Sequence, residues 1–202
     1  VRTGLRARII RTEKSFTNRQ MIKNTHVDFE RLLRGGEVAS SAVLIAFLDE
    51  IDLPYENIRG GLKLRDRPDP LDETSLGEHI RRNVEAEWLA DLDLQIYRTV
   101  GSTNDEVMQS FKGEGAHHRM YLSERQSAGK GRRGRRWVSP YGKNIYLSVG
   151  AFIELPLAQL GGLSLIIGMQ VVEVLRSYGM QGVGLKWPND VLYGSGKLAG
   201  IL

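Results

Sequence analysis

The sequence contains no cysteine and only four histidines among its 202 residues. Without a thiol the chain cannot form a disulfide framework, a thiolate zinc finger or an iron–sulfur site, and it has no cysteine nucleophile. It does not depend on such cross-links, because 41% of its residues are hydrophobic, which is enough to bury a core. The length fits one ordinary domain or two small ones.

Long apolar runs are scarce as well. We find no run that approaches the roughly 20 residues of a membrane-spanning helix, and the basic residues 1–11 are not followed by the apolar region of a secretory signal. We therefore expect a cytoplasmic protein with no membrane contact. The chain begins with Val1 and ends on the apolar residues 199–202, which a folded chain seldom leaves unprotected, so we expect a fragment of a longer protein.

The net charge of +4 is the sum of three blocks of alternating sign. Residues 1–36 carry nine basic and three acidic side chains, residues 37–100 carry seven and fourteen, and residues 101–202 carry twelve and seven. Two basic regions therefore flank an acidic one. A basic region can attract nucleic acid or polyphosphate, but for the first block we favour the interpretation of a solvated arm.

The first third of the chain has the outline of a small helical domain with a wing. We predict helices over residues 19–34 and 42–51, the second capped by one of the two serines before it. A hairpin is expected over residues 57–64, where apolar and basic residues alternate. This pattern predicts a degenerate winged helix-turn-helix-like domain over residues 1–65, followed by a proline-containing linker over residues 66–74.

The remaining residues alternate between strand-like and helix-like segments. One amphipathic helix is predicted over residues 75–90 and a long apolar helix within residues 160–178. The predicted strands are short and mostly joined by turns, and they lie at residues 94–97, 120–122, 144–149, 184–187, 191–193 and 197–202. These features indicate an α+β domain with a mixed sheet and packed helices, rather than a doubly wound Rossmann sheet.

The most informative segment, residues 126–137, combines glycines with arginines. Gly129, Gly131 and Gly134 have the spacing G-x-G-x-x-G, but the strand and helix of a Rossmann motif do not flank them. Five cations within residues 130–136 would repel one another unless an anion neutralised them. Glycine lets the backbone approach that anion, and arginine offers it a planar fork. Composition alone leaves two interpretations equal: a polyphosphate or adenylate clamp, and a basic loop for RNA or DNA.

A second segment, K-W-P-N-D at residues 186–190, favours the clamp. It gathers a cation, an aromatic ring, a turn, an amide and a carboxylate within five positions. A type I turn alone explains the last three residues, but it does not explain a lysine on an apolar strand. Lys197 repeats the pattern of a lone lysine beside an apolar run. Together the two lysines indicate converging positive charge for an anionic transition state.

A third segment, S-T-N at residues 102–104, follows a predicted strand. Ser102 or Thr103 is expected to cap a helix that begins at Asn104, whose first turn is acidic. Hydroxyl and N–H groups at such a helix start can also bind a small polar ligand.

These motifs, in this order, resemble those of the biotin–protein ligases. The family patterns are S-T-N, Q-x-A-G-R-G-R-R-G-R-x-W, K-W-P-N-D and K-x-x-G-I-L, and the likeness covers about residues 94–202 of this chain. The resemblance implies the mixed sheet of class II synthetases and biotinyl or lipoyl ligases over residues 75–202, incomplete at its C-terminal end. Some members are bifunctional, with an N-terminal winged helix-turn-helix that makes them biotin-responsive repressors.

The resemblance implies a biotin–[acetyl-CoA-carboxylase] ligase. Such an enzyme uses ATP and Mg²⁺ to attach biotin, through biotinyl-5′-AMP, to a lysine of a biotin carboxyl carrier protein. The implied biotin contacts are Ser102, Thr103, Asn104, Gln126, Lys130, Gly131, Arg132 and Lys197. The implied ATP and adenylate contacts are Arg132, Arg133, Arg135, Trp137, Lys186 and Asn189. The implied catalytic residues are Lys197, Lys186 and Arg132, and the implied metal ligand is Asp190. The resemblance leaves a homodimer open.

The sequence also departs from the family pattern and leaves rival functions open. Lys130 stands where the family has arginine, so a point charge replaces a bidentate fork. The helix over residues 42–51 has no Arg, Lys, Asn or Gln to read bases, so we expect weak or absent specific DNA binding. The alternatives are a biotin-responsive regulator with a DNA-binding N-terminal domain and a lipoate–protein ligase, which shares the fold and chemistry. The basic loop and K-W-P-N-D favour biotin.

Overall fold

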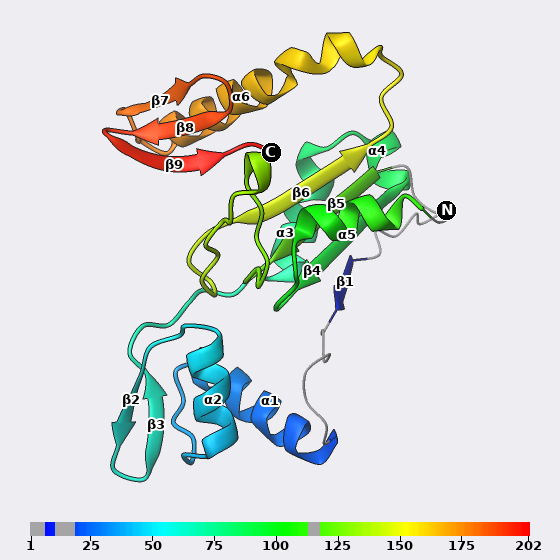
Figure 1. The fold of residues 1–202 in the computed structure, drawn as a ribbon. Helices are drawn as coiled ribbons and strands as arrows, with labels where there is room; N and C mark the ends of the chain where they lie inside the picture. The colour runs from blue at the N-terminus through cyan, green and yellow to red at the C-terminus, as the bar shows by residue number, and fades with distance from the viewer. Residues whose placement is uncertain (1–6, 11–18, 113–117) are drawn as a thin grey trace. The chain divides into compact units, whose positions relative to one another are not determined.

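The computed structural model of the chain describes residues 7–10, 19–112 and 118–202. Its elements are α-helices, β-strands and two short 3₁₀ segments, and in chain order they are β1 (Ala7–Ile10), α1 (Arg19–Leu33), α2 (Ala42–Glu50), β2 (Tyr55–Ile58), β3 (Gly61–Leu64), α3 (Glu73–Asn83), α4 (Ala86–Ala90), β4 (Leu92–Tyr97), α5 (Thr103–Ser110), β5 (His118–Ser123), η1 (Arg132–Gly134), β6 (Tyr146–Ala151), η2 (Leu157–Gly162), α6 (Leu163–Ser177), β7 (Val183–Lys186), β8 (Asp190–Tyr193) and β9 (Gly196–Gly200) (Figure 1). The fold is α+β, as the sequence predicts.

The chain divides into two compact units. The first unit comprises Val1–Lys130 and Arg136–Phe152, and the second comprises Gly131–Arg135 and Ile153–Leu202. Of the predicted basic arm over residues 1–36, residues 1–6 and 11–18 lie outside the described residues, whereas Arg19–Leu33 form α1, whose last turns are partly buried and not a solvated arm. The predicted domain limits at residues 65 and 74 stay predictions.

The main sheet of the first unit has the strand order β1-β4-β5-β6. β4 pairs in parallel with β1 and β5, whereas β5 pairs antiparallel with β6, so the sheet is mixed as predicted. Ile80 of α3 packs with Leu94 and Leu122, and Val107 of α5 packs with Tyr97 and Tyr121. Because neighbouring strand residues point to opposite faces, α3 and α5 cover opposite sides of the sheet.

Two features of the first unit differ from the sequence predictions. β1 was not predicted, because four residues inside a basic stretch without flanking turn residues give no strand signal. The single helix expected over residues 75–90 is two helices, because α3 ends at Asn83 and Val84 has extended backbone angles, φ −114° and ψ 138°. The Asn83 side chain donates to the carbonyl of His79 at 2.8 Å, a local bond that competes with helix continuation.

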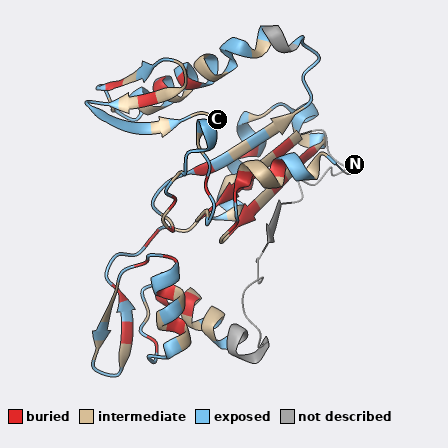
Figure 2. Ribbon diagram, viewed as in Figure 1, coloured by how far each residue is buried: buried red, intermediate tan, exposed pale blue. Residues whose placement is uncertain are grey.

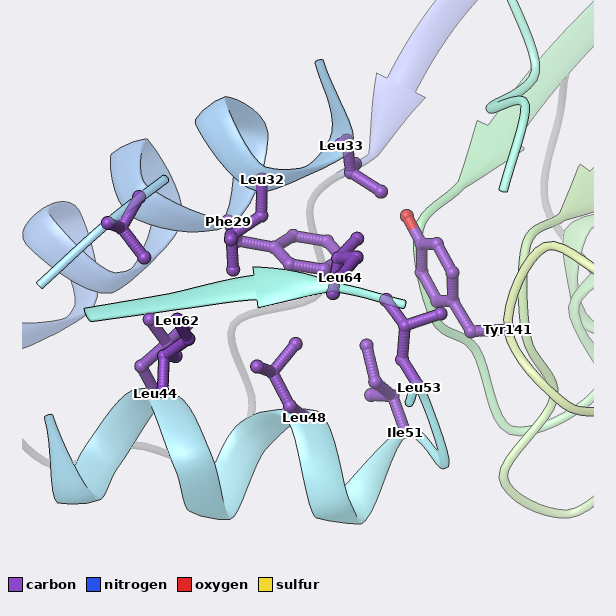
Figure 3. Close-up of a cluster of buried hydrophobic side chains, with 11 residues drawn as sticks. Phe29, Leu32, Leu33, Leu44, Leu48, Ile51, Leu53, Leu62, Leu64 and Tyr141 are labelled. Carbon is purple, nitrogen blue, oxygen red and sulfur yellow. The ribbon is translucent and has the colours of Figure 1, made fainter. Parts of the chain in front are cut away.

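The helices α1 and α2 and the hairpin β2–β3 share one buried cluster (Figure 3). Leu44 and Leu48 lie on one face of α2 and contact this cluster, while Leu62 of β3 is fully buried within it. Ser41 caps α2 as predicted, since its hydroxyl accepts from the main-chain N–H of Leu44 at 3.2 Å. The ring of Tyr141 joins the cluster edge-on to Phe29, 5.5 Å between centroids.

The second unit places α6 against the three-stranded antiparallel sheet β7-β8-β9 (Figure 1). Val172 of α6, Val183 of β7 and Val191 of β8 form its buried core, and the rest of α6 is largely exposed (Figure 2). The stretch Gln159–Ser177 has 19 residues with mean hydropathy 1.4. By length and composition alone it could cross a membrane, so the prediction that no apolar run approaches this length is wrong. One such helix is weak support for a span, because core helices pass the same test.

Candidate active site

The segments that follow β4 and β5 lie side by side at the carboxyl ends of these two parallel strands. Val100 forms a parallel bridge with Gln126. The main-chain N–H groups of Ser127 and Ala128 donate to the carbonyls of Val100 and Gly101, at 2.9 and 2.8 Å. Ligands of open sheets bind outside the carboxyl ends of parallel strands. The structure therefore brings the S-T-N segment and the start of the glycine-arginine loop to one edge.

Gln126 connects the two segments through its side chain. Its Oε1 accepts from the main-chain N–H of Thr103 at 2.9 Å and from the Thr103 hydroxyl at 3.1 Å. Thr103 is the first residue of α5, so a side chain from a distant segment caps this helix. Ser102 occupies the predicted N-cap position, but its hydroxyl makes no capping hydrogen bond. The prediction is therefore right for the position and wrong for the capping group.

Two further hydroxyls join this network, and neither belongs to a predicted site residue. The Thr103 hydroxyl lies 2.9 Å from that of Ser148 on β6, and Gln126 Nε2 donates to the Ser139 hydroxyl at 3.3 Å. Ser102 and Thr103 are only 2% and 3% exposed, whereas Gln126 and Ser148 are half-buried, so this polar floor is partly shielded from water. A serine at Ser148 in an otherwise apolar strand was the one available signal for its role.

The glycine-arginine loop begins with a close backbone approach. A Cβ atom on Gly129 would lie 2.5 Å from the Trp137 carbonyl oxygen and 2.7 Å from the Ser139 hydroxyl, so only glycine fits. The main-chain N–H of Trp137 donates to the Gly129 carbonyl at 2.8 Å, and Lys130 pairs antiparallel with Arg136. These contacts close the base of the loop within the first unit.

Lys130 is held by a carboxylate that is not among the predicted site residues. Its Nζ lies 2.8 Å from Oδ1 and 2.7 Å from Oδ2 of Asp105, in the first turn of α5. The pair is open to solvent, with the lysine side chain 51% and the aspartate side chain 38% exposed.

The tip of the loop belongs to the second unit. There Arg132 Nη1 donates to Asn189 Oδ1 at 3.1 Å, while Asn189 Nδ2 donates to the carbonyl of Ile201 at 2.6 Å. Because the second bond fixes which amide atom is the oxygen, Asn189 presents an acceptor to the arginine. Arg133 has the left-handed angles φ 59° and ψ 37°, which are uncommon for a non-glycine residue and strain the backbone at the loop tip. The arginines of the loop are exposed.

The K-W-P-N-D segment connects β7 and β8, which pair Lys186 with Asp190. The predicted hairpin is therefore confirmed, and its Trp187–Pro188 peptide bond is cis. Lys197 on β9 reaches back to β8, where its Nζ lies 2.6 Å from Asp190 Oδ1. Both predicted catalytic lysines thus lie beside Asp190 on adjacent strands of one sheet.

No group of three or more His, Asp or Glu side chains that could enclose a metal ion occurs among the residues described. Asp190, the predicted metal ligand, is an isolated carboxylate engaged by Lys197. This arrangement does not fit a metal cage made by the protein. It does fit the usual binding mode of Mg²⁺, in which one carboxylate assists a cation that substrate phosphates already hold.

One buried carboxylate lies behind the strand ends. Glu124 is 2% exposed, and its Oε1 accepts from the main-chain N–H of Leu71 at 2.6 Å and from Arg98 at 3.4 Å. Burial raises the pKa of this carboxyl, because the charged form is desolvated, although both partners act in the opposite direction. Tyr121, on β5, has its pKa raised to about 12 by burial and by its hydrogen bond to Asp93.

The predicted site residues fall into two groups, one in each unit. The first unit holds Ser102, Thr103, Asn104, Gln126, Lys130 and Trp137. The second holds Gly131, Arg132, Arg133, Arg135, Lys186, Asn189, Asp190 and Lys197. Hydrogen bonds join members of each group to one another within their unit, and the role of each residue stays a prediction.

Comparison with known proteins places the chain in a family. Residues 96–202 match the biotin/lipoate A/B protein ligase family. The match covers more than half of the chain, and the protein belongs to this family. The family predicted from the motifs is therefore confirmed.

The chain is also similar to individual proteins. The chain is 41% identical over 131 residues to the bifunctional ligase/repressor BirA of Escherichia coli, covering 63% of this chain and 40% of that protein. It is 38% identical over 138 residues to the biotin–[acetyl-CoA-carboxylase] ligase of Mycobacterium tuberculosis, covering 66% and 50%. The biotin protein ligase of Leishmania major in complex with biotin gives a TM-score of 0.47 at 29% identity, over 55% of this chain and 50% of that one. The chain thus spans about half the length of these relatives or less.

Proposed function

We propose that the protein attaches biotin to a specific lysine of a biotin carboxyl carrier protein, with ATP as the activating substrate. The observation that carries the proposal is the contact between Thr103 and Gln126, at 2.9 Å from the main-chain nitrogen and 3.1 Å from the hydroxyl. Each residue comes from a different family motif, and their contact assembles a polar, partly buried floor at a strand edge. Such a floor suits the ureido ring of biotin, which offers both N–H and C=O groups.

In the first step, an oxygen of the biotin carboxylate attacks the α-phosphorus of ATP. The bond to the bridging oxygen breaks and pyrophosphate leaves, giving biotinyl-5′-AMP. Two anions must approach each other, so the proposed task of Lys130, Arg132, Lys186 and Lys197 is to offset negative charge. Arg133 and Arg135 would contact phosphate, and Trp137 would lie against the adenine. The Arg132–Asn189 bond of 3.1 Å supports a defined position for the central arginine.

In the second step, the uncharged amine of the carrier lysine attacks the acyl carbon of the adenylate. An amide forms, the amine loses a proton and AMP leaves. Lys197 and Lys186 lie beside Asp190 on one sheet, which supports their proposed action as a pair on the leaving phosphate. Ser102, Thr103, Asn104, Gln126 and Gly131 complete the proposed biotin contacts.

Mg²⁺ is proposed to enter with ATP, and Asp190 is its proposed protein ligand. The ion would supply charge neutralisation on the phosphates. The single carboxylate at this position supports that mode and not a resident metal centre.

We also propose that α1, α2 and the hairpin β2–β3 form a degenerate winged domain within residues 1–65, joined by the linker 66–74 to the ligase domain that begins at residue 75. Support comes from their shared buried cluster (Figure 3). The exposed positions of α2 are Ala42, Ala46, Asp49 and Glu50, which carry no base-reading cation or amide. This favours the ligase over a DNA-binding regulator. The cytoplasm is the proposed location, because the chain lacks cysteine and its proposed substrate is ATP.

The test is transfer by the full-length protein. It is incubated with Mg-ATP, a biotin carboxyl carrier domain and either biotin or lipoate, and the carrier mass is measured. We expect a mass increase for one biotin and none for lipoate, and no increase when the acceptor lysine of the carrier is replaced by arginine. Transfer of lipoate alone, or no transfer, would refute the proposal.

A further inference from the structure

Lys130 of the glycine-arginine loop forms an ion pair with Asp105 of α5, and the family resemblance gives Asp105 no function. Lys130 Nζ contacts both carboxylate oxygens of Asp105, at 2.8 and 2.7 Å. An exposed ion pair on its own says little, since many such pairs contribute almost nothing to stability. This pair differs because the backbone on both sides of it is fixed, and because one partner is a predicted substrate contact.

The backbone around the pair sets its geometry. Asp105 lies in the first turn of α5, whose first residue is held by Gln126. On the other side, Ala128 donates to the carbonyl of Gly101 at 2.8 Å, and Lys130 is itself paired with Arg136. The two side chains therefore meet because their main chains are tied together, and not through a chance conformation of a long lysine.

A lysine ammonium is a single charge with three N–H donors. In the structure, the Asp105 carboxylate pairs with this charge. The acid group of biotin is chemically the same kind of anion, and a compact point charge serves two carboxylates less well than an arginine fork does. We propose that Asp105 is an internal counter-ion that holds Lys130 in place and that the substrate carboxylate must displace. Asp105 is thus a positioning residue that sets affinity for the free acid.

This inference rests on the proposed function, since it takes the ligand to be biotin. The test measures binding of biotin and of biotinamide, which lacks the negative charge, to the full-length protein by calorimetry. In Asp105→Asn, we expect the dissociation constant for biotin to fall about two- to fivefold, the range that exposed ion pairs allow. Binding of biotinamide should not change, and the gain for biotin should shrink in high salt.

Glu106→Gln is the matched control, because it removes the same charge from the next residue of α5. It should change biotin affinity by less than Asp105→Asn does. A second comparison uses Lys130→Met: in that background, adding Asp105→Asn should produce no further gain over adding Glu106→Gln.

The inference is overturned if Asp105→Asn weakens biotin binding, acts equally on biotinamide, or merely equals Glu106→Gln. Its failure is distinguishable from failure of the proposed function. If the unaltered protein binds neither biotin nor biotinamide, the proposed function is wrong. If it binds both and only the Asp105 effect is missing, the counter-ion role is wrong.

Discussion

The side-chain oxygen of Gln126 accepts two hydrogen bonds from Thr103, one from the main-chain nitrogen at 2.9 Å and one from the hydroxyl at 3.1 Å. The first of these satisfies one of the N–H groups that every helix leaves open at its start. The second orients a hydroxyl that also contacts Ser148, at 2.9 Å. A single amide therefore supports both the start of α5 and the polar floor proposed for biotin.

Truncation of this amide should weaken biotin binding. In Gln126→Ala, the N–H and hydroxyl of Thr103 lose their acceptor in a site that is partly shielded from water. Such a loss costs about 1–3 kcal/mol, so the biotin dissociation constant should rise about 5- to 150-fold. Calorimetry provides the measurement, and Gln109→Ala, at an exposed position of α5, is the control. Equal affinities for the two variants would remove Gln126 from the site.

Loss of the Lys197 ammonium should slow the chemistry more than it weakens binding. If this charge acts on the reacting phosphate, Lys197→Ala should lower kcat about 10²- to 10³-fold with a small change in the KM for ATP. Pyrophosphate release reports the first step. Lys63→Ala is the control, because it breaks a comparable lysine–carboxylate pair, to Glu56 at 2.9 Å, on the β2–β3 hairpin. A raised KM with normal kcat would assign Lys197 to binding alone.

Capping, apolar spacing and turn residues predict those elements whose contacts lie within a short stretch of sequence. The hydroxyl of Ser41 and the apolar spacing of Leu44 and Leu48 predict α2 and its start, and the hairpin β2–β3 follows from alternation around a glycine turn. The K-W-P-N-D hairpin was predicted for the same reason. In each case the residues that determine the element lie within a few positions of one another.

The features that could not be predicted depend on contacts between residues far apart in the sequence. β1 is stabilised by its parallel pairing with β4, and a pattern of four residues is too short to predict such a pairing. The order of the motifs predicts Thr103 and Gln126 as site residues. It does not predict the hydrogen bond between them, because they lie 23 positions apart in different motifs. Asp105 looked like an ordinary acid of a first helical turn, because its partner Lys130 lies 25 positions away.

The buried Glu124 carboxyl predicts a pH-dependent stability. Burial raises its pKa above the ordinary value of 4.5. The protonated carboxyl therefore contributes fully to the free energy of unfolding below about pH 4.5, and this contribution is lost as the pH rises through the raised pKa of the folded protein. Glu124→Gln keeps an acceptor for the N–H of Leu71 but cannot ionise. Its melting temperature, relative to that of the unaltered protein, should therefore rise as the pH is raised from 4.5 to neutral. Circular dichroism measures it, with exposed Glu154→Gln as control. A difference that falls with rising pH contradicts the assignment.

The exposed face of α2 predicts weak DNA binding. Its outward positions include Asp49 and Glu50, and carboxylates at a recognition surface repel phosphate. In an electrophoretic shift assay with DNA from upstream of the protein's own gene, we expect no retardation beyond that of shuffled DNA of equal composition. Tight, sequence-specific retardation that biotin and ATP strengthen would show that the domain is a working repressor module.

Removal of the Arg132 guanidinium should release the adenylate before transfer. Arg132 is the arginine of the loop tip that donates to Asn189, at 3.1 Å, and it is proposed to contact the anionic intermediate. Loss of one hydrogen bond to a charged group costs about 1.5–3 kcal/mol, which corresponds to about 10- to 150-fold faster escape. In Arg132→Ala we therefore expect biotin on lysines of a bystander protein such as serum albumin, detected by mass spectrometry. Arg136→Ala removes an exposed arginine from the same loop and should label the bystander no more than the unaltered protein does. If both variants label it equally, the loss of loop charge in general, and not the position of Arg132, governs retention.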